Sequence, residues 1–296
     1  MSVTVTDPLG GGIVHKDPSA GPGQILRPEV GTLETGKPFV LDMREIPHWL
    51  ITGATQSGKS SLLGSLIKGL SLQAVAILGI DCKGGMELGL YGGRLSALAA
   101  SRQEAIEVLE RVLGEIKDRM GVCRAAGTRT IWDLKSPPLP LVVIVDELAE
   151  LYLTDGSKSS KDEAERCGTL LLRISQLGAA LGVHLVLSGQ RVGSDLGSRI
   201  TALRAQMGGR VAHRSHDEAS AEMTLGDLHP DAVVVAQTIS DSERGVSVVA
   251  SGGTWTRAKS HLLNPGDAAE IARIPAPPNP WVSTPGDTAT EFGGNS

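Results

Sequence analysis

The sequence predicts an α/β fold in which a mostly parallel sheet is flanked by helices on both faces. Three observations predict it: apolar strand-like runs alternate with longer helical patterns, a glycine loop joins one apolar run to a helical one, and a second apolar run ends in two acidic residues. Alternating strands and helices favour a parallel sheet, because each strand must return through a crossover that packs on the sheet. The order of these runs along the chain gives the expected order of the elements.

The composition is that of a globular protein with one large domain. Of the 296 residues, 41% are hydrophobic and 21% are charged, which provides for a sizeable core. Glycine and proline are dense in residues 1–38 and again from Pro275. We therefore expect a flexible or extended N-terminal segment (1–38), a single α/β domain (39–264) and a disordered C-terminal tail (265–296).

The chain has no feature of an exported or membrane-spanning protein. No window approaches the roughly 18 consecutive apolar residues that a membrane span needs, and the N-terminus lacks the regions of a signal peptide. These observations predict a cytoplasmic chain with no transmembrane segment of its own. The formal net charge of −5 argues against a surface coated with phosphate-binding groups, although a local basic stretch could still contact nucleic acid.

Residues 50–63, LITGATQSGKSSLL, contain an apolar strand, a glycine loop and the start of a helix. The loop has the pattern G-x-x-x-x-G-K-S, and strand, loop and helix are the context that a phosphate-binding loop requires. Backbone N–H groups would cradle the phosphates, Lys59 would reach the β- and γ-phosphates, and Ser60 would bind Mg²⁺. The expected nucleotide-binding residues are Gly53, Ala54, Thr55, Gln56, Ser57, Gly58, Lys59, Ser60 and Ser61.

Other runs complete the expected sheet and its helices. Residues 101–126 place apolar side chains at helical spacing with charges opposite, which indicates an amphipathic helix. GVSVVASGGTWTRAKSHLL is typical of a hairpin that turns at Gly252 and Gly253. The further strand-like runs are FVLDM, AVAILGID, RVAHR, DAVVVAQT and RGVSVVA.

The run LPLVVIVDELAEL ends a buried strand in Asp146 and Glu147. Acids at the carboxyl end of such a strand face the crevice where ligands bind. Asp146 would hold Mg²⁺, and Glu147 would orient or deprotonate the water that attacks the γ-phosphate. Because a carboxylate suits water as the nucleophile, hydrolysis is the favoured reaction. In GVHLVLSGQRV another strand ends at Gln190, which could bond both the γ-phosphate and that water.

Four segments of the sequence together resemble the motifs of one family. PHWLITGATQSGKSSLL, GIDCKGGMEL, VVIVDELAEL and LGVHLVLSGQRV occur in an order and spacing similar to those of the FtsK/SpoIIIE motor ATPases, especially the transfer proteins of actinobacterial conjugative plasmids and integrative elements. The resemblance runs from about Ile46 to Leu262. It implies a RecA-like P-loop NTPase core that binds ATP and Mg²⁺, assembles as a ring, usually a homohexamer, and pumps double-stranded DNA.

The resemblance also assigns roles by position. Lys59 and Ser60 match the Walker A motif, Asp146 and Glu147 the Walker B pair, and Gln190 the sensor. Where the family often has D-P-K-x-x-E-L, this chain has DCKGGMEL, with one extra residue before the glutamate. That version also resembles the ATPases of type VII protein secretion. An arginine finger that acts across a ring interface would neutralise charge in the transition state, and Arg173 is the first candidate and Arg210 the second.

Residues 191–214 contain five arginines and one acid, Asp195. In a ring, a few arginines from each subunit would make enough phosphate contacts for salt-dependent DNA binding. A solvated arginine-rich face is the alternative. The expected DNA contacts are Arg191, Arg199 and Arg204.

The expected function is therefore an ATP-hydrolysing motor that translocates double-stranded DNA in mobile-element transfer between cells. Two alternatives remain: an ATPase that powers type VII-like protein secretion, and a nucleotide-switched scaffold that does not hydrolyse ATP. Intact Lys59, Asp146 and Glu147 count against the scaffold, and the 191–214 arginines count against secretion. A membrane-anchored transfer partner could bring the chain to the membrane.

Overall fold

A computed structural model describes residues 9, 25–190, 192–193, 196–215, 217–226, 228–278 and 281, without the side chains of residues 198 and 265. Its centre is a ten-stranded sheet with the order β2-β1-β10-β9-β8-β3-β7-β6-β4-β5. The six strands from β8 to β5 are parallel, and antiparallel strands extend the sheet beyond β8. The predicted α/β fold with a mostly parallel sheet is confirmed.

The parallel strands are short and mostly fully buried. They are β3 (His48–Thr52), β4 (Ala76–Ile80), β5 (Ala97–Ala99), β6 (Leu141–Val145), β7 (Val183–Gly189) and β8 (Gly209–His213). The antiparallel strands are β1 (Glu29–Leu33), β2 (Pro38–Val40), β9 (Val246–Ser251) and β10 (Thr254–Ser260). β9 and β10 form the predicted hairpin, which pairs with β8 on one side and β1 on the other.

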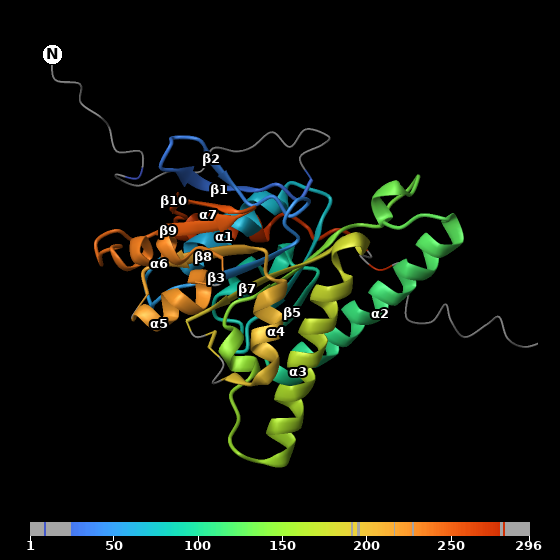
Figure 1. Ribbon diagram of the computed structural model, residues 1–296. Coiled ribbons are helices and arrows are strands. Elements are labelled where there is room, and N and C mark those ends of the chain that lie inside the picture. Colours follow the sequence, from blue (N-terminus) through green and yellow to red (C-terminus); the bar gives the residue numbers. More distant parts are fainter. Residues whose placement is uncertain are drawn as a thin grey trace, which may run out of the picture.

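Helices cover both faces of the sheet (Figure 1). The α-helices are α1 (Lys59–Ser71), α2 (Arg102–Ala126), α3 (Lys158–Leu177), α4 (Ser198–Gln206), α5 (Glu218–Ala221), α6 (Pro230–Gln237) and α7 (Pro265–Ala272). Short helical turns are η1 (Leu88–Arg94), η2 (Ile131–Asp133), η3 (Leu148–Leu151), η4 (Ala179–Leu181) and η6 (Glu222–Gly226). None of the helices in the described ranges combines the length and apolarity needed to cross a bilayer.

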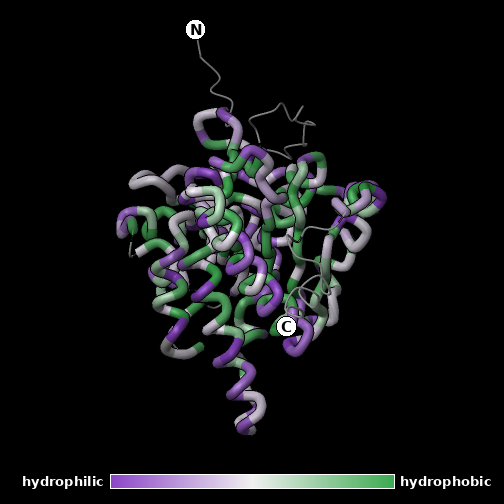
Figure 2. The backbone as a smooth tube through the Cα atoms, turned by 90° about the vertical axis from the view of Figure 1, so that its right-hand side faces the viewer, coloured by the Kyte–Doolittle hydropathy of each residue, from purple (hydrophilic) through white to green (hydrophobic). Residues whose placement is uncertain are grey.

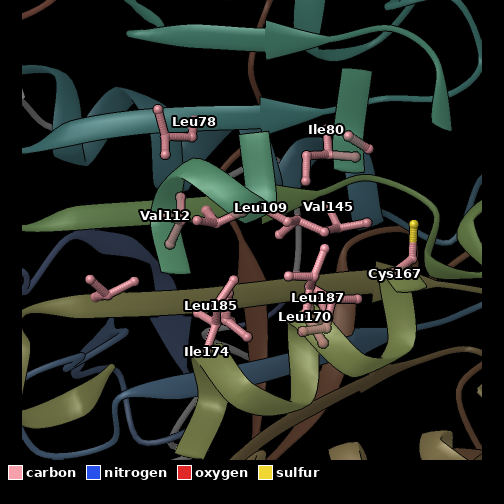
Figure 3. Close-up of a cluster of buried hydrophobic side chains, with 14 of the residues drawn as sticks. Leu78, Ile80, Leu109, Val112, Val145, Cys167, Leu170, Ile174, Leu185 and Leu187 are labelled. Carbon is pink, nitrogen blue, oxygen red and sulfur yellow. The ribbon is translucent and has the colours of Figure 1, made fainter. Parts of the chain in front are cut away.

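Side chains of one strand alternate between two cores, because successive side chains of a strand point to opposite faces. On β6, Val143 and Val145 pack with α2 and α3, whereas Val142 and Ile144 pack with α1. Figure 3 shows the first core, where side chains of β4, β6 and β7 meet those of α2 and α3. Figure 2 shows hydrophobic segments concentrated in the interior and a hydrophilic lower end. The two-sided core fixes the sheet, and the strand ends carry the candidate site.

The run DAVVVAQT was predicted as a strand, and this prediction is wrong. Residues 230–237 form α6, with Pro230 in its first turn, where a missing N–H costs nothing. Ala232, Val233 and Ala236 are buried, while Val234 is 64% exposed. This is the spacing of a helix that packs one face against β9. The β-branched valines suggested a strand, but tertiary packing overrides that local preference.

The predicted domain limits differ from the structure at both ends. β1 lies within the predicted N-terminal segment, 1–38, yet it pairs with β10 and belongs to the sheet. α7 lies within the predicted C-terminal tail, 265–296, and it has a capping box formed by Asn264 and Asp267. Ile271 of α7 is buried against the core that contains α1. Both ends of the domain therefore extend beyond residues 39–264, and residues 282–296 lie outside the described ranges.

Two buried histidines make the fold sensitive to acid. Burial lowers the pKa of His48 to about 4 and that of His184 to about 3, from 6.5. The unfolded chain therefore takes up their protons first as pH falls below 6.5, and folding stability is lost from there down to the folded pKa values. We expect the free energy of unfolding to fall by about 2 kcal/mol per histidine between pH 7 and pH 5.

The measurement is urea unfolding at both pH values for the wild type and His184→Asn. His184 Nδ1 lies 3.2 Å from the carbonyl oxygen of Pro47, and an asparagine amide can donate to the same oxygen. His184→Asn should show a smaller loss of stability in acid than the wild type. Equal losses in the two proteins would show that His184 titrates normally in the folded state.

Candidate functional site

The phosphate-binding loop joins β3 to α1 at the carboxyl ends of the parallel strands (Figure 1). Gly58 is the N-cap of α1, and no side chain caps the first N–H groups of this helix. Gly58 has a φ of +120°, and a Cβ there would lie 2.6 Å from the Cα of Gly245, so only glycine fits. The predicted strand, loop and helix context is confirmed, and an uncapped helix N-terminus of this kind is suited to an anion.

The side chain of Lys59 folds back onto the start of the phosphate-binding loop. Its Nζ donates to the carbonyl oxygens of Gly53 at 2.5 Å and Ala54 at 3.1 Å. Burial lowers the pKa of Lys59, while the nearby Glu147 and Asp146 carboxylates act in the opposite direction. The site thus places one ammonium group between the loop and the predicted acids.

Gln190 connects the loop to the acids after β6. β7 lies between β3 and β6 in the sheet, and Gln190 follows β7 directly. Its backbone N–H donates to Glu147 Oε1 at 3.1 Å, and its side-chain oxygen accepts a hydrogen bond from Thr55 Oγ1 at 3.3 Å. One residue therefore contacts both halves of the site, as a nucleotide sensor would need to do.

Glu147 has a second partner in the turn that follows β4. Lys83 Nζ lies 3.6 Å from Glu147 Oε2. Lys83 is positioned by a turn built on the buried Asp81, whose carboxylate accepts N–H groups of Lys83, Glu87 and Leu88 at distances of 2.8 to 3.2 Å. In this chain Asp81 therefore shapes the turn, and Lys83 sets the charge around Glu147.

Asp146 and Ser60 offer a carboxylate and a hydroxyl oxygen, which are suitable ligands for the predicted Mg²⁺ ion. Asp146 is only 8% exposed, and burial, followed by the nearby Asp81, raises its pKa to about 6. A cation beside Asp146 would favour its charged form. Within the described ranges no cluster of three histidine, cysteine or acidic side chains could hold a metal alone. A Mg²⁺ ion here would thus take phosphate and water oxygens besides these two residues, as Mg²⁺ commonly does.

A cavity of about 630 Å³ adjoins the loop, and its far wall was missed by the sequence reasoning. Ser242, Arg244, Gly245 and residues 259–262 form this wall. Gly245 N–H donates to Ser57 O at 2.9 Å, and Arg214 joins the same region to the loop through Asp241 at 2.9 Å and Thr55 O at 3.5 Å. No short motif signals such a wall, because it forms only when the hairpin pairs with β8.

The candidate arginine finger Arg210 requires a correction. Its side chain is 2% exposed, and its three nitrogens donate to the carbonyl oxygens of Met207, Thr224 and Arg204 at 2.8 to 2.9 Å. A guanidinium that is buried and bonded to three carbonyl oxygens inside the subunit cannot reach across an interface. Arg173 on α3 is exposed and bonds Gln176 of its own helix at 3.0 Å.

Of the predicted DNA-binding arginines, the two that the structure describes both bond groups of their own chain. Arg199 is 39% exposed and pairs with Glu165 at 2.6 Å. Arg204 is partly buried and donates to Val192 O at 3.2 Å. Arg191 lies outside the described residues.

Comparison with known proteins agrees with the geometry. The sequence profile described as FtsK/SpoIIIE family matches residues 15–136 and 132–194. The chain is 40% identical over 279 residues to the transfer protein TraSA of Streptomyces ambofaciens, which covers 90% of this chain and 67% of TraSA. It is 28% identical over 221 residues to the DNA translocase FtsK of Listeria monocytogenes, which covers 68% of this chain but only 28% of FtsK.

A solved structure shows the same fold. The pCW3 conjugation coupling protein TcpA, in its monomer form with ATPγS, superposes with a TM-score of 0.75 at 20% identity, covering 88% of this chain and 73% of TcpA. The predicted P-loop NTPase fold is thus confirmed.

Proposed function

The chain belongs to the FtsK/SpoIIIE family, and we propose that it is an ATP-hydrolysing motor that translocates double-stranded DNA in the transfer of a mobile element between cells. The observation that carries the proposal is the joining of loop and acids: Gln190 bonds Glu147 on one side and Thr55 of the loop on the other. The names of the relatives, a transfer protein and a DNA translocase, support DNA as the cargo.

Each residue of the site has a distinct part in hydrolysis. The loop and Lys59 bind the β- and γ-phosphates, and Glu147 accepts the proton of the attacking water. Ser60 and Asp146 would hold Mg²⁺, which neutralises charge on the phosphates when it is bound. Gln190 bonds both Glu147 and the loop, so a change at the γ-phosphate would be transmitted to the segment that follows β7.

The test is steady-state ATP hydrolysis with and without long double-stranded DNA at two salt concentrations, with Lys59→Ala as the blank. Strong stimulation that declines with salt is the expected result, because phosphate contacts release counterions. ATP turnover that is indifferent to DNA would favour protein secretion. Binding of ATP without turnover, alone or with DNA, would favour a scaffold.

The contribution of Arg199 can be tested through its ion pair. Arg199 Nη2 lies 2.6 Å from Glu165 Oε1. If Arg199 contacts DNA, the Glu165 carboxylate therefore competes with the DNA phosphates for the Arg199 guanidinium. Arg199→Gln should weaken DNA binding severalfold and flatten its dependence on salt, whereas Glu165→Gln should strengthen binding. Arg204→Gln is expected to weaken binding as well.

The readout is DNA affinity by fluorescence anisotropy over a salt series. Arg27→Gln serves as the control, since Arg27 forms a comparable ion pair with Asp42 at 2.9 Å and belongs neither to α4 nor to the 191–214 stretch. Affinity and salt slope that stay unchanged in both Arg199→Gln and Glu165→Gln would remove Arg199 from the DNA path.

Three further features belong to the proposal. The motor acts as a homohexameric ring, Arg173 supplies the finger across the interface, and a membrane-anchored partner brings the ring to the membrane. The exposed position of Arg173 supports its assignment.

A further inference from the structure

The far wall of the cavity beside the phosphate-binding loop contains two cations. Arg244 and Lys259 line the cavity together with Gly58, Lys59 and Ser60 of the loop and α1. Lys259 Nζ already donates to Leu9 O at 2.8 Å. Arg244 is exposed, and within the described part of the chain it has neither a hydrogen bond nor an ion pair. Among the residues that the structure describes, nothing thus competes with a ligand for the charge of Arg244.

The position of Arg244 relative to the loop is fixed by its neighbour. Gly245 N–H donates to Ser57 O at 2.9 Å, and Gly245 O accepts the N–H of Ser260 at 3.0 Å. Gly58 and Gly245 approach so closely that a Cβ on Gly58 would clash with Gly245 backbone atoms. The residue next to Gly245 is therefore attached to the phosphate-binding loop itself.

The acids around Arg244 are paired with other arginines. Glu243 Oε1 binds Arg257 at 2.7 Å, and Asp241 binds Arg214 at 2.9 Å. These pairs leave Arg244 as the cation that the 241–245 segment presents to the cavity. A guanidinium offers a planar set of N–H donors that matches phosphate oxygens.

We propose that Arg244 binds the α-phosphate of the nucleotide whose β- and γ-phosphates lie at the loop and the start of α1. The inference rests on the proposed function and adds a contact from the wall opposite the loop. The cavity extends from Lys59 toward residues 259–262, away from Glu147 and Gln190, which do not line it. An anion in that direction is the α-phosphate, because the terminal phosphates belong at Lys59 and the acids. ATP and ADP share this group, so Arg244 should bind both equally well.

The test is calorimetric titration of the full chain with Mg-ATP and Mg-ADP. We expect Arg244→Ala to weaken the binding of both nucleotides by about tenfold or more and by similar factors, since hydrogen bonds to charged groups are worth that much. Arg244→Lys should retain part of the affinity. Arg129→Ala is the matched control, because Arg129 is also exposed, has no partner within the described residues and does not line the cavity.

Several results would overturn the assignment. Affinities of Arg244→Ala within twofold of the wild type for both nucleotides would show that the guanidinium does not contact them. A loss of affinity for ATP but not for ADP would place the Arg244 guanidinium at the γ-phosphate instead. A wild-type chain that binds neither nucleotide would overturn the proposed function itself, and that result is distinguishable from the first two.

Discussion

Glu147→Gln is expected to lower the rate of ATP hydrolysis by about 10²- to 10⁴-fold, the usual contribution of a general base, while ATP binding stays within a few-fold of the wild type. A glutamine amide cannot accept the proton of the attacking water, but its oxygen can still accept the N–H of Gln190, which lies 3.1 Å from Glu147 Oε1. The exchange therefore removes the base and keeps the contact. The variant should accumulate in an ATP-bound assembly.

Single-turnover hydrolysis and nucleotide binding, measured on the same protein, separate these effects. Glu150→Gln is the matched control, because it makes the same change three residues further on, outside the contacts of Gln190 and Lys83. Hydrolysis by Glu147→Gln at the wild-type rate would show that another group takes the proton. Glu147→Gln also removes a negative charge that faces Lys83. A small gain in affinity for the anionic nucleotide would therefore agree with the assignment.

The nucleotide site could be predicted because its signals are local. The glycine loop, the acids after β6 and Gln190 after β7 each follow a strand whose apolar sequence is evident, and parallel strands bring their carboxyl ends to one edge. What joins these residues was not visible in the sequence. The bonds of Gln190 to Thr55 and Glu147 depend on β7 lying between β3 and β6, which is a property of strand order.

The misjudged positions share one physical cause. Arg210 was a candidate for the finger, but three carbonyl oxygens of neighbouring turns bind it in the interior. Residues 230–237 have the valines of a strand and form a helix, because their buried face packs against β9. In both cases a long-range contact decides the outcome. Arg244 was missed for the same reason, since its cavity forms only in the folded hairpin.

Lys59→Ala is expected to weaken ATP binding by roughly 100-fold or more and to abolish measurable turnover, because a charge-assisted contact in a partly buried site is lost. The charges around the site make the effect large. The Lys59 ammonium interacts with Glu147, Asp146 and Glu87, so its removal leaves the acids of the site unopposed on that side. A triphosphate would then approach carboxylates without the cation that separates them.

The matched control for this variant is on the same helix. Lys68→Ala makes an identical change on α1, where Lys68 pairs with Asp267 of α7 at 3.1 Å, and it should leave ATP binding unchanged. Thermal unfolding of both variants would verify that α1 remains folded. If Lys59→Ala bound ATP as tightly as the wild type, the nucleotide would have to lie outside the loop, and the roles given to Ser60, Asp146 and Glu147 would fail with it. If Lys59→Ala lost ATP affinity and Lys68→Ala kept it, the triphosphate would be located at the N-terminus of α1.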